Sequence, residues 1–221
     1  MPPAAPRRAP LRLSLGLWLG LAGPVLADDP HAHCRELSAQ ASGPAAVAAD
    51  GARADVKVID AALLDQEGRD LRLRDDVIGD RIVVMNFVYT TCTTVCPLLS
   101  ARFTGLQAAL GERLGREVRL VSLSIDPLHD TPTRLKAYAE RHRAGAGWLH
   151  LTGRADEVEQ VLRGLGAYSP RLADHAPMTL VGDGRTGRWT RINGFPSAAQ
   201  LLAQVDALAS ARQVLARQEA R

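Results

Sequence analysis

The sequence predicts an α/β sandwich with a central mixed sheet flanked by helices. Two patterns carry this prediction. Apolar, β-branched runs at 82–89 and 118–125 are typical of buried strands. Each run is followed by a segment with apolar residues at three- and four-residue spacing, which is typical of an amphipathic helix. Regular alternation of the two patterns indicates a layered α/β domain.

The first half of the domain is expected to open with a hairpin, because apolar residues alternate on both sides of a polar turn. The elements expected there are a hairpin over 56–73 with its turn at 65–69, a polar loop at 75–81, a central strand at 82–89, and a helix from Pro97 to about 111–115.

The second half repeats strands and helices and closes with two strands and a long helix. Thr131 and Ser197 are expected to cap helices, and Gly166 to end one. The expected elements are a strand at 118–125, a helix from Pro132 to about 142, a strand at 148–151, a helix around 158–165, strands at 178–181 and 188–192, and a helix from Ala198 to about 212 or beyond.

Two cysteines, Cys92 and Cys96, lie between the central strand and the helix that follows it. Pro97 fits the first turn of that helix, where its missing N–H costs nothing. The free N–H groups and the dipole at a helix N-terminus favour thiolate over thiol. Thiolate is the form that binds a metal ion or attacks a disulfide, so this corner is the candidate functional site.

The spacing of the two cysteines leaves three interpretations open. Dithiol redox sites usually have two residues between the cysteines, whereas Cys92 and Cys96 have three. On a regular helix their Cβ atoms would lie about 5–6 Å apart, and a disulfide needs about 3.5–4.5 Å. A soft metal ion tolerates the wider gap, since each metal–sulfur bond is about 2.3 Å. Metal binding, dithiol redox chemistry and a structural disulfide all remain.

The N-terminus has the pattern of a secretory signal peptide over residues 1–27. Three arginines precede an apolar run at 13–21, which is short for a membrane span, and Val25-Leu26-Ala27 offers a cleavage site. The alternative is an uncleaved segment that tethers the protein to the membrane. We therefore expect a signal peptide at 1–27, a flexible linker at 28–55 and one folded domain at 56–221, in an exported, periplasmic protein.

Charge argues against nucleic-acid binding. The chain has 27 basic and 24 acidic residues, and three of the basic ones are Arg7, Arg8 and Arg12 in the signal segment. Without them the count is 24 against 24, so the exported protein is close to neutral. No basic run with interleaved aromatic residues is present in the sequence.

A third cysteine, Cys34, lies in the cluster His31-Ala32-His33-Cys34 within the expected linker. These residue types bind soft metal ions, so the cluster is a candidate capture site or a source of an intermolecular thiol. The alternative is a solvated thiol in a flexible segment, because nothing nearby fixes ligand geometry.

Three blocks in the sequence resemble the SCO/SenC family. They are Asn86 to Pro97 with its CxxxCP pattern, Ser124-Ile125-Asp126-Pro127 followed by Asp130-Thr131-Pro132, and Asp174-His175 before Met178. The resemblance runs from about 56 to 208 and keeps the order of the blocks. It implies a thioredoxin-like fold, a copper site made by Cys92, Cys96 and His175, and a role in metallating the di-copper centre of cytochrome oxidase.

The residues themselves are compatible with that copper site. Two thiolates favour Cu(I), and an added imidazole suits Cu(II). Asp174 or a backbone carbonyl could hold the second ring nitrogen of His175, as metal-bound imidazoles usually require. Asp126 and Asp130 either orient the site or serve as ordinary turn and capping residues. The remaining candidates, His129, His142 and His150, are expected at surface and strand positions.

Pro177 departs from the family pattern. Thiol–disulfide oxidoreductases of the same fold carry a cis proline at a comparable place, facing the dithiol. Pro177 directly precedes the strand at 178–181, so it favours a redox role beside or instead of copper binding.

The sequence thus predicts an exported copper chaperone that delivers copper to the copper-accepting subunit of a terminal oxidase. The alternative is a thiol:disulfide oxidoreductase, with Cys92 and Cys96 redox-active and a thiol reductase as a further partner. His175 favours the first and Pro177 the second. A structural domain with an inert disulfide would leave His175 without a purpose.

Overall fold

The computed structural model describes residues 51–220. The predicted signal peptide, nearly all of the predicted linker and Cys34 lie outside the described residues. Within the described chain, no helix is both long and apolar enough to span a bilayer.

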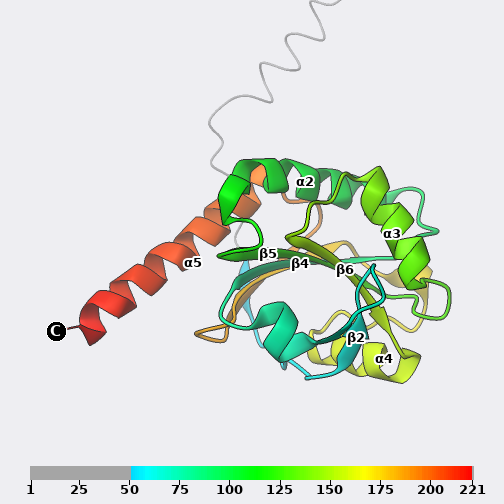
Figure 1. Ribbon diagram of the computed structural model, residues 1–221, viewed down its shortest axis with the longest axis horizontal. Helices are drawn as coiled ribbons and strands as arrows, with labels where there is room; N and C mark the ends of the chain where they lie inside the picture. The colour runs from blue at the N-terminus through cyan, green and yellow to red at the C-terminus, as the bar shows by residue number, and fades with distance from the viewer. Residues whose placement is uncertain (1–50, 221) are drawn as a thin grey trace, which may run out of the picture. The chain divides into compact units, whose positions relative to one another are not determined.

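An eight-stranded mixed sheet forms the centre of the domain (Figure 1). Its spatial order is β1-β8-β7-β4-β5-β6-β2-β3. The three central strands β4, β5 and β6 are parallel, and the other neighbours pair antiparallel. The strands are β1 Ala52–Ala54, β2 Ala62–Leu64, β3 Asp70–Arg72, β4 Ile82–Val88, β5 Val118–Ser124, β6 Trp148–Gly153, β7 Met178–Asp183 and β8 Arg188–Asn193.

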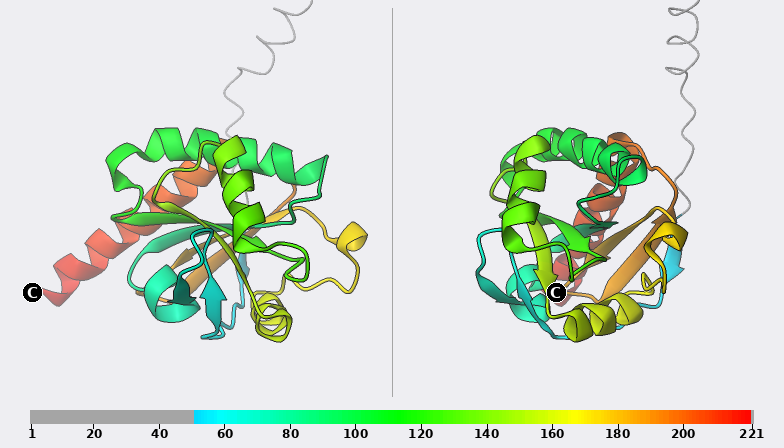
Figure 2. Two further views of the ribbon diagram at one scale, coloured as in Figure 1. Left: turned by 45° about the vertical axis from the view of Figure 1, so that its right-hand side comes forward. Right: turned by 90° about the vertical axis from the view of Figure 1, so that its right-hand side faces the viewer.

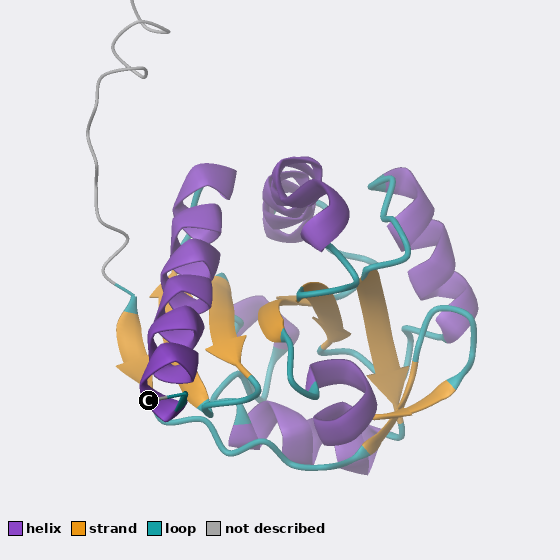
Figure 3. Ribbon diagram, turned by 60° about the vertical axis from the view of Figure 1, so that its left-hand side comes forward, coloured by secondary structure: helices purple, strands orange, loops and turns teal. Residues whose placement is uncertain are grey.

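Helices cover both faces of this sheet (Figure 3). They are α2 Val95–Leu110, α3 Pro132–Arg141, α4 Ala155–Gly164 and α5 Ala198–Glu219, with short helical turns η1 Leu73–Ile78, η2 Gly111–Arg113 and η3 Leu172–Asp174. The predicted caps are present: the Thr131 hydroxyl accepts a hydrogen bond from the Arg134 N–H, and Ser197 forms a reciprocal capping box with Gln200.

The core has two layers because successive residues of the buried strands point to opposite faces of the sheet. In β4, Val84 packs with residues of α2 and α5 on one face. Its neighbour Met85 packs with residues of α4 and η1 on the other face. The predicted α/β sandwich with an N-terminal hairpin, β2–β3, is confirmed.

Three local predictions need correction. Residues 52–54 lie in the predicted linker but form the edge strand β1, because their backbone pairs with β8. The expected polar loop at 75–81 contains most of η1, a π-helical turn whose Val77 and Ile78 are buried. Helix α2 begins at Val95, which places Cys96 inside its first turn.

The last helix, α5, is packed at its start and free at its end. Leu201 and Val205 are fully buried, whereas the side chains of Val214 and Leu215 are 54% and 42% exposed. Figure 2 shows the C-terminal end of α5 extending past the edge of the sheet.

Candidate metal centre

Both cysteines of the predicted site lie at the corner between β4 and α2. Cys92 is in the loop that follows Val88, and Cys96 is in the first turn of the helix. Both thiols are free, and the residues are 8% and 3% exposed. They pack with Val88 and Tyr138 in a small cluster separate from the two main core layers. The corner therefore presents a nearly buried pair of free thiols.

The two thiols differ in their environments. The Cys96 backbone N–H donates to the Cys92 sulfur at 3.3 Å. Burial raises the pKa of Cys92, but hydrogen bonds from the Cys96 side chain, the Cys96 backbone and further groups outweigh it and lower the pKa to about 7. Burial, followed by the hydrogen bond with the Cys92 sulfur, raises the pKa of Cys96 to about 12. One thiolate is thus formed near neutral pH, and the second sulfur acts as its hydrogen-bond donor.

Tyr89 is a member of this site that the sequence analysis did not single out. Its hydroxyl shares a hydrogen bond with the Cys92 sulfur, which lowers the pKa of Cys92 and is the largest cause that raises the pKa of Tyr89 to about 12. The only sequence signal was its position three residues before Cys92, which is compatible with many other roles.

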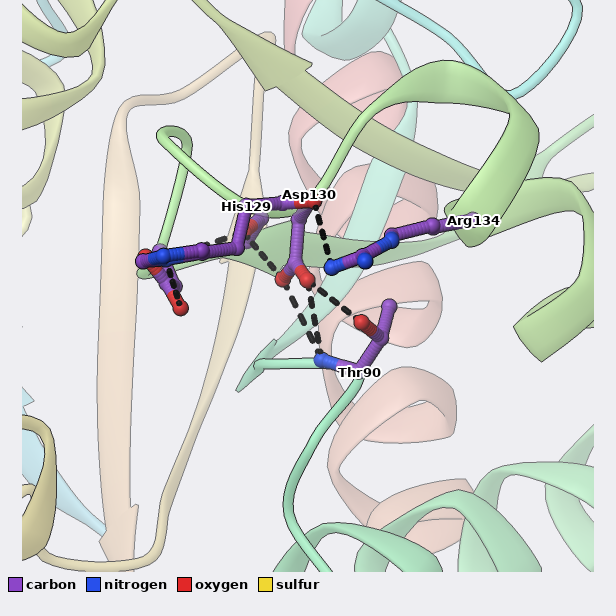
Figure 4. Close-up of polar contacts among 6 residues, drawn as sticks. Thr90, His129, Asp130 and Arg134 are labelled. Atoms are coloured by element: carbon purple, nitrogen blue, oxygen red, sulfur yellow. Dashed lines mark hydrogen bonds and ion pairs between the residues drawn. The ribbon is translucent and has the colours of Figure 1, made fainter.

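The buried carboxylate of Asp130 holds the start of the cysteine loop. It accepts hydrogen bonds from the Thr90 backbone N–H at 3.1 and 3.2 Å and from the Thr90 hydroxyl at 2.6 Å. The Ser124 hydroxyl donates to its other oxygen at 2.6 Å. Figure 4 shows Asp130 reaching Thr90 from the loop after β5. Asp130 therefore positions the cysteine loop in addition to shaping its own turn.

Asp126, the other aspartate of that block, serves its own turn. Its backbone carbonyl accepts from the N–H groups of His129 and Asp130, and its carboxylate contacts His129 Nδ1 at 2.8 Å. The sequence left two roles open for these aspartates, orienting the site or forming a turn. Asp130 contacts the cysteine loop, and Asp126 forms the turn that carries Asp130.

His175, the predicted third ligand, follows η3 and lies against the end of β4. Its ring meets the edge of Phe87 with 5.9 Å between ring centroids. Burial lowers the pKa of His175, and a hydrogen bond with the backbone of Ala167 partly opposes this. Its Nε2 atom is buried and has no hydrogen-bond partner. A ring with one nitrogen held by the backbone and the other free has the arrangement typical of a metal-ligating imidazole.

The structure brings the two cysteines together but does not group His175 with them. Across residues 51–220, no three His, Cys, Asp or Glu side chains are close enough to hold one metal ion. The two soft sulfurs and the unpartnered imidazole nitrogen fit copper by donor type. The three-ligand site therefore stays a prediction that requires His175 to approach the cysteines.

The other described histidines have different surroundings. His150 is fully buried in β6 and stacks on Trp148, and burial lowers its pKa to about 3. His142 follows α3, half-buried, with its ring 4.7 Å from that of Tyr138. His129 is exposed, as expected from the sequence.

The Ala176–Pro177 peptide bond is trans. The comparison with oxidoreductases that carry a cis proline at this place therefore no longer supports a redox role. The carbonyl of Pro177 accepts a hydrogen bond from the Gly194 N–H at 2.8 Å, which links the start of β7 to the end of β8.

An α/β sandwich with two free thiols at a strand-to-helix corner defines a thioredoxin-like dithiol protein. The family model for SCO1/SenC matches residues 51–209, and the chain belongs to this family. The match agrees with the resemblance that the three sequence blocks predicted.

Known relatives and solved structures agree with this assignment. The SCO1 protein homolog of Bacillus subtilis is 32% identical over 99 residues, which are 43% of this chain and 49% of that protein. The chain thus matches about half the length of this relative. The structure of BsSco, a member of the Sco family of cytochrome c oxidase assembly proteins, aligns with a TM-score of 0.61 and 22% identity, covering 72% of this chain and 97% of BsSco.

A second similar structure is yeast Sco1 with copper bound. It aligns with a TM-score of 0.55 and 20% identity, covering 74% of this chain and 92% of that one. At these identities the structural matches establish the fold, and the thioredoxin-like prediction is confirmed.

Proposed function

We propose that this protein is an exported copper chaperone that helps to metallate the copper centre of a terminal cytochrome oxidase. The observation that carries the proposal is the pair of free, nearly buried thiols of Cys92 and Cys96, one with its pKa lowered to about 7. Membership of the SCO1/SenC family and the copper-bound structure of yeast Sco1 support it. Export rests on the predicted signal peptide at 1–27.

In the proposed site, Cys92 and Cys96 hold Cu(I) and His175 completes the coordination of Cu(II). The hydrogen bonds within the segment before His175 are local: Asp174 N–H to Arg171 carbonyl and His175 N–H to Leu172 carbonyl, with an ion pair between Arg171 and Asp174. Such a segment can shift as a unit and keep these internal bonds, whereas the hydrogen bond between the His175 ring and the backbone of Ala167 would break unless Ala167 moved with it. We infer that this shift brings Nε2 to the metal.

Delivery of the ion is a ligand exchange. An acceptor thiolate replaces one thiolate of the Cys92–Cys96 pair at a time, and no electron is transferred. The acceptor proposed here is the copper-accepting subunit of a terminal oxidase, in line with BsSco, which belongs to a family of oxidase assembly proteins.

The test is copper stoichiometry of the reduced protein. Wild type should bind one copper ion per chain, and Cys92→Ser or Cys96→Ser should lose tight Cu(I) binding, since a hydroxyl is a poor ligand for a soft ion. Cys34→Ser is the matched control and should keep one copper. Stoichiometric copper on Cys92→Ser would refute the site, and a halved copper content in Cys34→Ser would assign metal binding to the His31–Cys34 cluster.

The role of His175 is tested separately. His175→Ala should bind Cu(I) almost as tightly as wild type, because two thiolates suffice for that ion. Its Cu(II) complex should lose or shift the sulfur-to-copper charge-transfer absorption. An unchanged Cu(II) spectrum would show that His175 is not a ligand.

The second candidate function is thiol:disulfide oxidoreductase. The separation of the two thiol pKa values, one near 7 and one near 12, favours it, because a nucleophilic thiolate beside a protonated thiol is typical of dithiol redox pairs. We expect modest reductase activity that copper suppresses by occupying the thiolates. Multiple-turnover reduction that is insensitive to copper would make this the primary function.

A further inference from the structure

The ring of His175 is tied to the end of helix α4. Its Nε2 atom is buried without a hydrogen-bond partner, so the hydrogen bond with the backbone of Ala167 is made by Nδ1. That bond raises the pKa of His175 against the effect of burial, which means that the ring donates and the Ala167 carbonyl accepts. The neutral ring therefore carries its hydrogen on Nδ1 and its lone pair on Nε2.

Ala167 is itself held by the turn that ends α4. Its N–H donates to the Leu162 carbonyl at 2.8 Å, and the Gly166 N–H donates to the Arg163 carbonyl at 3.1 Å. Gly166 has a φ of +64°, the left-handed conformation typical of a residue that ends a helix. Ala167 is 4% exposed and packs in the core layer that includes residues of α4. The ring of His175 is therefore tied to a fixed point in the folded core.

Arg191, a half-buried residue of β8, joins this turn to the sheet. Its Nη2 atom donates to the Leu165 carbonyl at 3.0 Å. A Cβ atom at position 166 would collide with the same nitrogen, so the guanidinium fits against the turn only because residue 166 is glycine. Arg191 thus fixes the turn 165–167 by a hydrogen bond and by close packing.

The polar contact of Arg191 is directed at this turn and at no carboxylate. Across residues 51–220 no acidic side chain forms an ion pair with Arg191, and its Nε atom is buried without a partner. Arg212, by contrast, forms an ion pair with Asp183. Within the part of the chain that the structure describes, the Leu165 carbonyl is the hydrogen-bond acceptor that the Arg191 guanidinium contacts.

The segment 168–174 leaves the turn at Ala167 and returns to it at the ring of His175. Within the segment, the Ser169 hydroxyl donates to the Arg171 carbonyl at 2.9 Å, and Arg171 forms an ion pair with Asp174. The bond from the His175 ring to the Ala167 carbonyl closes the segment on a base that Arg191 fixes. Movement of His175 toward the cysteines therefore either breaks that bond or pulls the turn away from Arg191.

We propose that Arg191 is a positioning residue that holds the imidazole of His175 at its metal-free position through the turn 165–167. Cu(I) bound by two thiolates leaves this arrangement intact. Cu(II) draws Nε2 to the metal, which breaks the bond to Ala167 or moves the turn. Arg191 therefore weakens Cu(II) binding relative to Cu(I) binding. This inference rests on the proposed role of His175 as the third copper ligand.

The test is the reduction potential of the bound copper, measured by spectroelectrochemical titration. Arg191→Met keeps an aliphatic stem but loses the bond to Leu165. Its turn can move with His175, so the Cu(II) affinity should rise several-fold and the reduction potential should fall. The Cu(I) affinity should stay within about twofold of wild type, since the two thiolates supply it.

Two further variants make this test specific. Gly166→Ala displaces the guanidinium from the other side of the contact and should shift the reduction potential in the same direction. Arg188→Met is the matched control, because Arg188 is an exposed arginine of the same strand, and it should keep the wild-type potential.

A measurement on the metal-free protein tests the positioning without copper. Nitrogen NMR of the His175 imidazole should show the Nδ1–H tautomer in wild type and a mixture of both tautomers in Arg191→Met. Arg191→Lys keeps a donor for the Leu165 carbonyl and should keep the wild-type tautomer.

An unchanged reduction potential in Arg191→Met, or an equal fall in Arg188→Met, would overturn the proposal. A lower Cu(II) affinity in Arg191→Met would also overturn it, because Arg191 would then place His175 for the metal instead of holding it back. Failure of wild type to bind copper would overturn the proposed function. The same tautomer in wild type and Arg191→Met would overturn the role of Arg191 whether or not copper binds.

Discussion

Two buried aspartates, at opposite ends of the central strands, have different partners. Asp183 ends β7 beside the start of β4 and forms an ion pair with Arg212 of α5 at 2.6 Å. Asp130 follows β5 at the cysteine end, and its hydrogen-bond donors, Thr90 and Ser124, are uncharged. Both residues are 1% exposed. Among the residues that the structure describes, no cationic side chain forms an ion pair with Asp130.

The difference separates an end of the sheet that is held by an ion pair from the end that carries the cysteine loop. Burial raises the pKa of Asp183, but Arg212 and backbone N–H groups outweigh it and hold that pKa below its usual range. The charge of Asp183 is therefore compensated, and it fixes α5 to the sheet. The charge of Asp130 is not, and it contributes to raising the pKa of Cys96.

The largest effect on the free energy of unfolding is expected when the ion pair between Asp183 and Arg212 is removed. Asp183→Asn leaves the guanidinium of Arg212, whose side chain is 13% exposed, without its anion. Removing one partner of a buried pair costs roughly 3–5 kcal/mol of unfolding free energy. Urea denaturation measures this loss, and the stoichiometry of copper binding should not change. A loss below about 1 kcal/mol would show that the pair is not structural.

His150, which is fully buried in β6, should make the free energy of unfolding depend on pH. Burial lowers the pKa of His150 to about 3 from 6.5. Below pH 6.5 the unfolded chain therefore binds a proton that the folded chain does not, so the stability present above pH 6.5 is lost progressively as the pH falls toward 3. The slope is about 1.4 kcal/mol per pH unit, or about 2 kcal/mol between pH 6.5 and 5.

The comparison for this prediction is His150→Gln, which has no titrating ring. Its unfolding free energy, measured by urea at several pH values, should fall less steeply between pH 6.5 and 5 than that of wild type. Parallel curves for the two proteins would contradict the assignment to His150.

A smaller effect on stability is expected at the cysteine end. Asp130→Asn keeps the shape and can still accept a hydrogen bond from Thr90, so the unfolding free energy should fall by only about 1 kcal/mol. Loss of the negative charge should lower the pKa of Cys96. The alkylation rate of the remaining thiol in a Cys92→Ser background, followed against pH, measures that shift. A Cys96 pKa that stays the same or rises in Asp130→Asn would show that the charge of Asp130 does not raise the pKa of Cys96.

Local signals explain what the sequence predicted correctly. Thr131 and Ser197 cap helices by accepting hydrogen bonds from N–H groups three residues further along the chain. Strand β4 is buried along its whole length. Each of these features could therefore be inferred from the adjacent residues in the sequence. The corner position of Cys92 and Cys96 followed in the same way from a strand pattern, a proline and a helix pattern.

Contacts between distant segments explain what was missed. Asp130 reaches Thr90 across 40 residues, and β1 exists only because β8 supplies its partner. The hydrogen bond between Tyr89 and Cys92 depends on the path of the loop, which no periodicity encodes. The position of His175 relative to the cysteines is likewise set by the packing of its segment, so its residue type could be predicted but its distance could not.

The central claim is that Cys92, Cys96 and His175 hold copper together. X-ray absorption at the copper edge tests this most directly, on wild type and on His175→Ala, in both oxidation states. Wild type should show two sulfur neighbours at about 2.3 Å in both states and an added nitrogen neighbour in Cu(II). His175→Ala should keep the two sulfurs and lose the imidazole signal. Fewer than two sulfur neighbours in wild type, or an imidazole signal that persists in His175→Ala, would contradict the account.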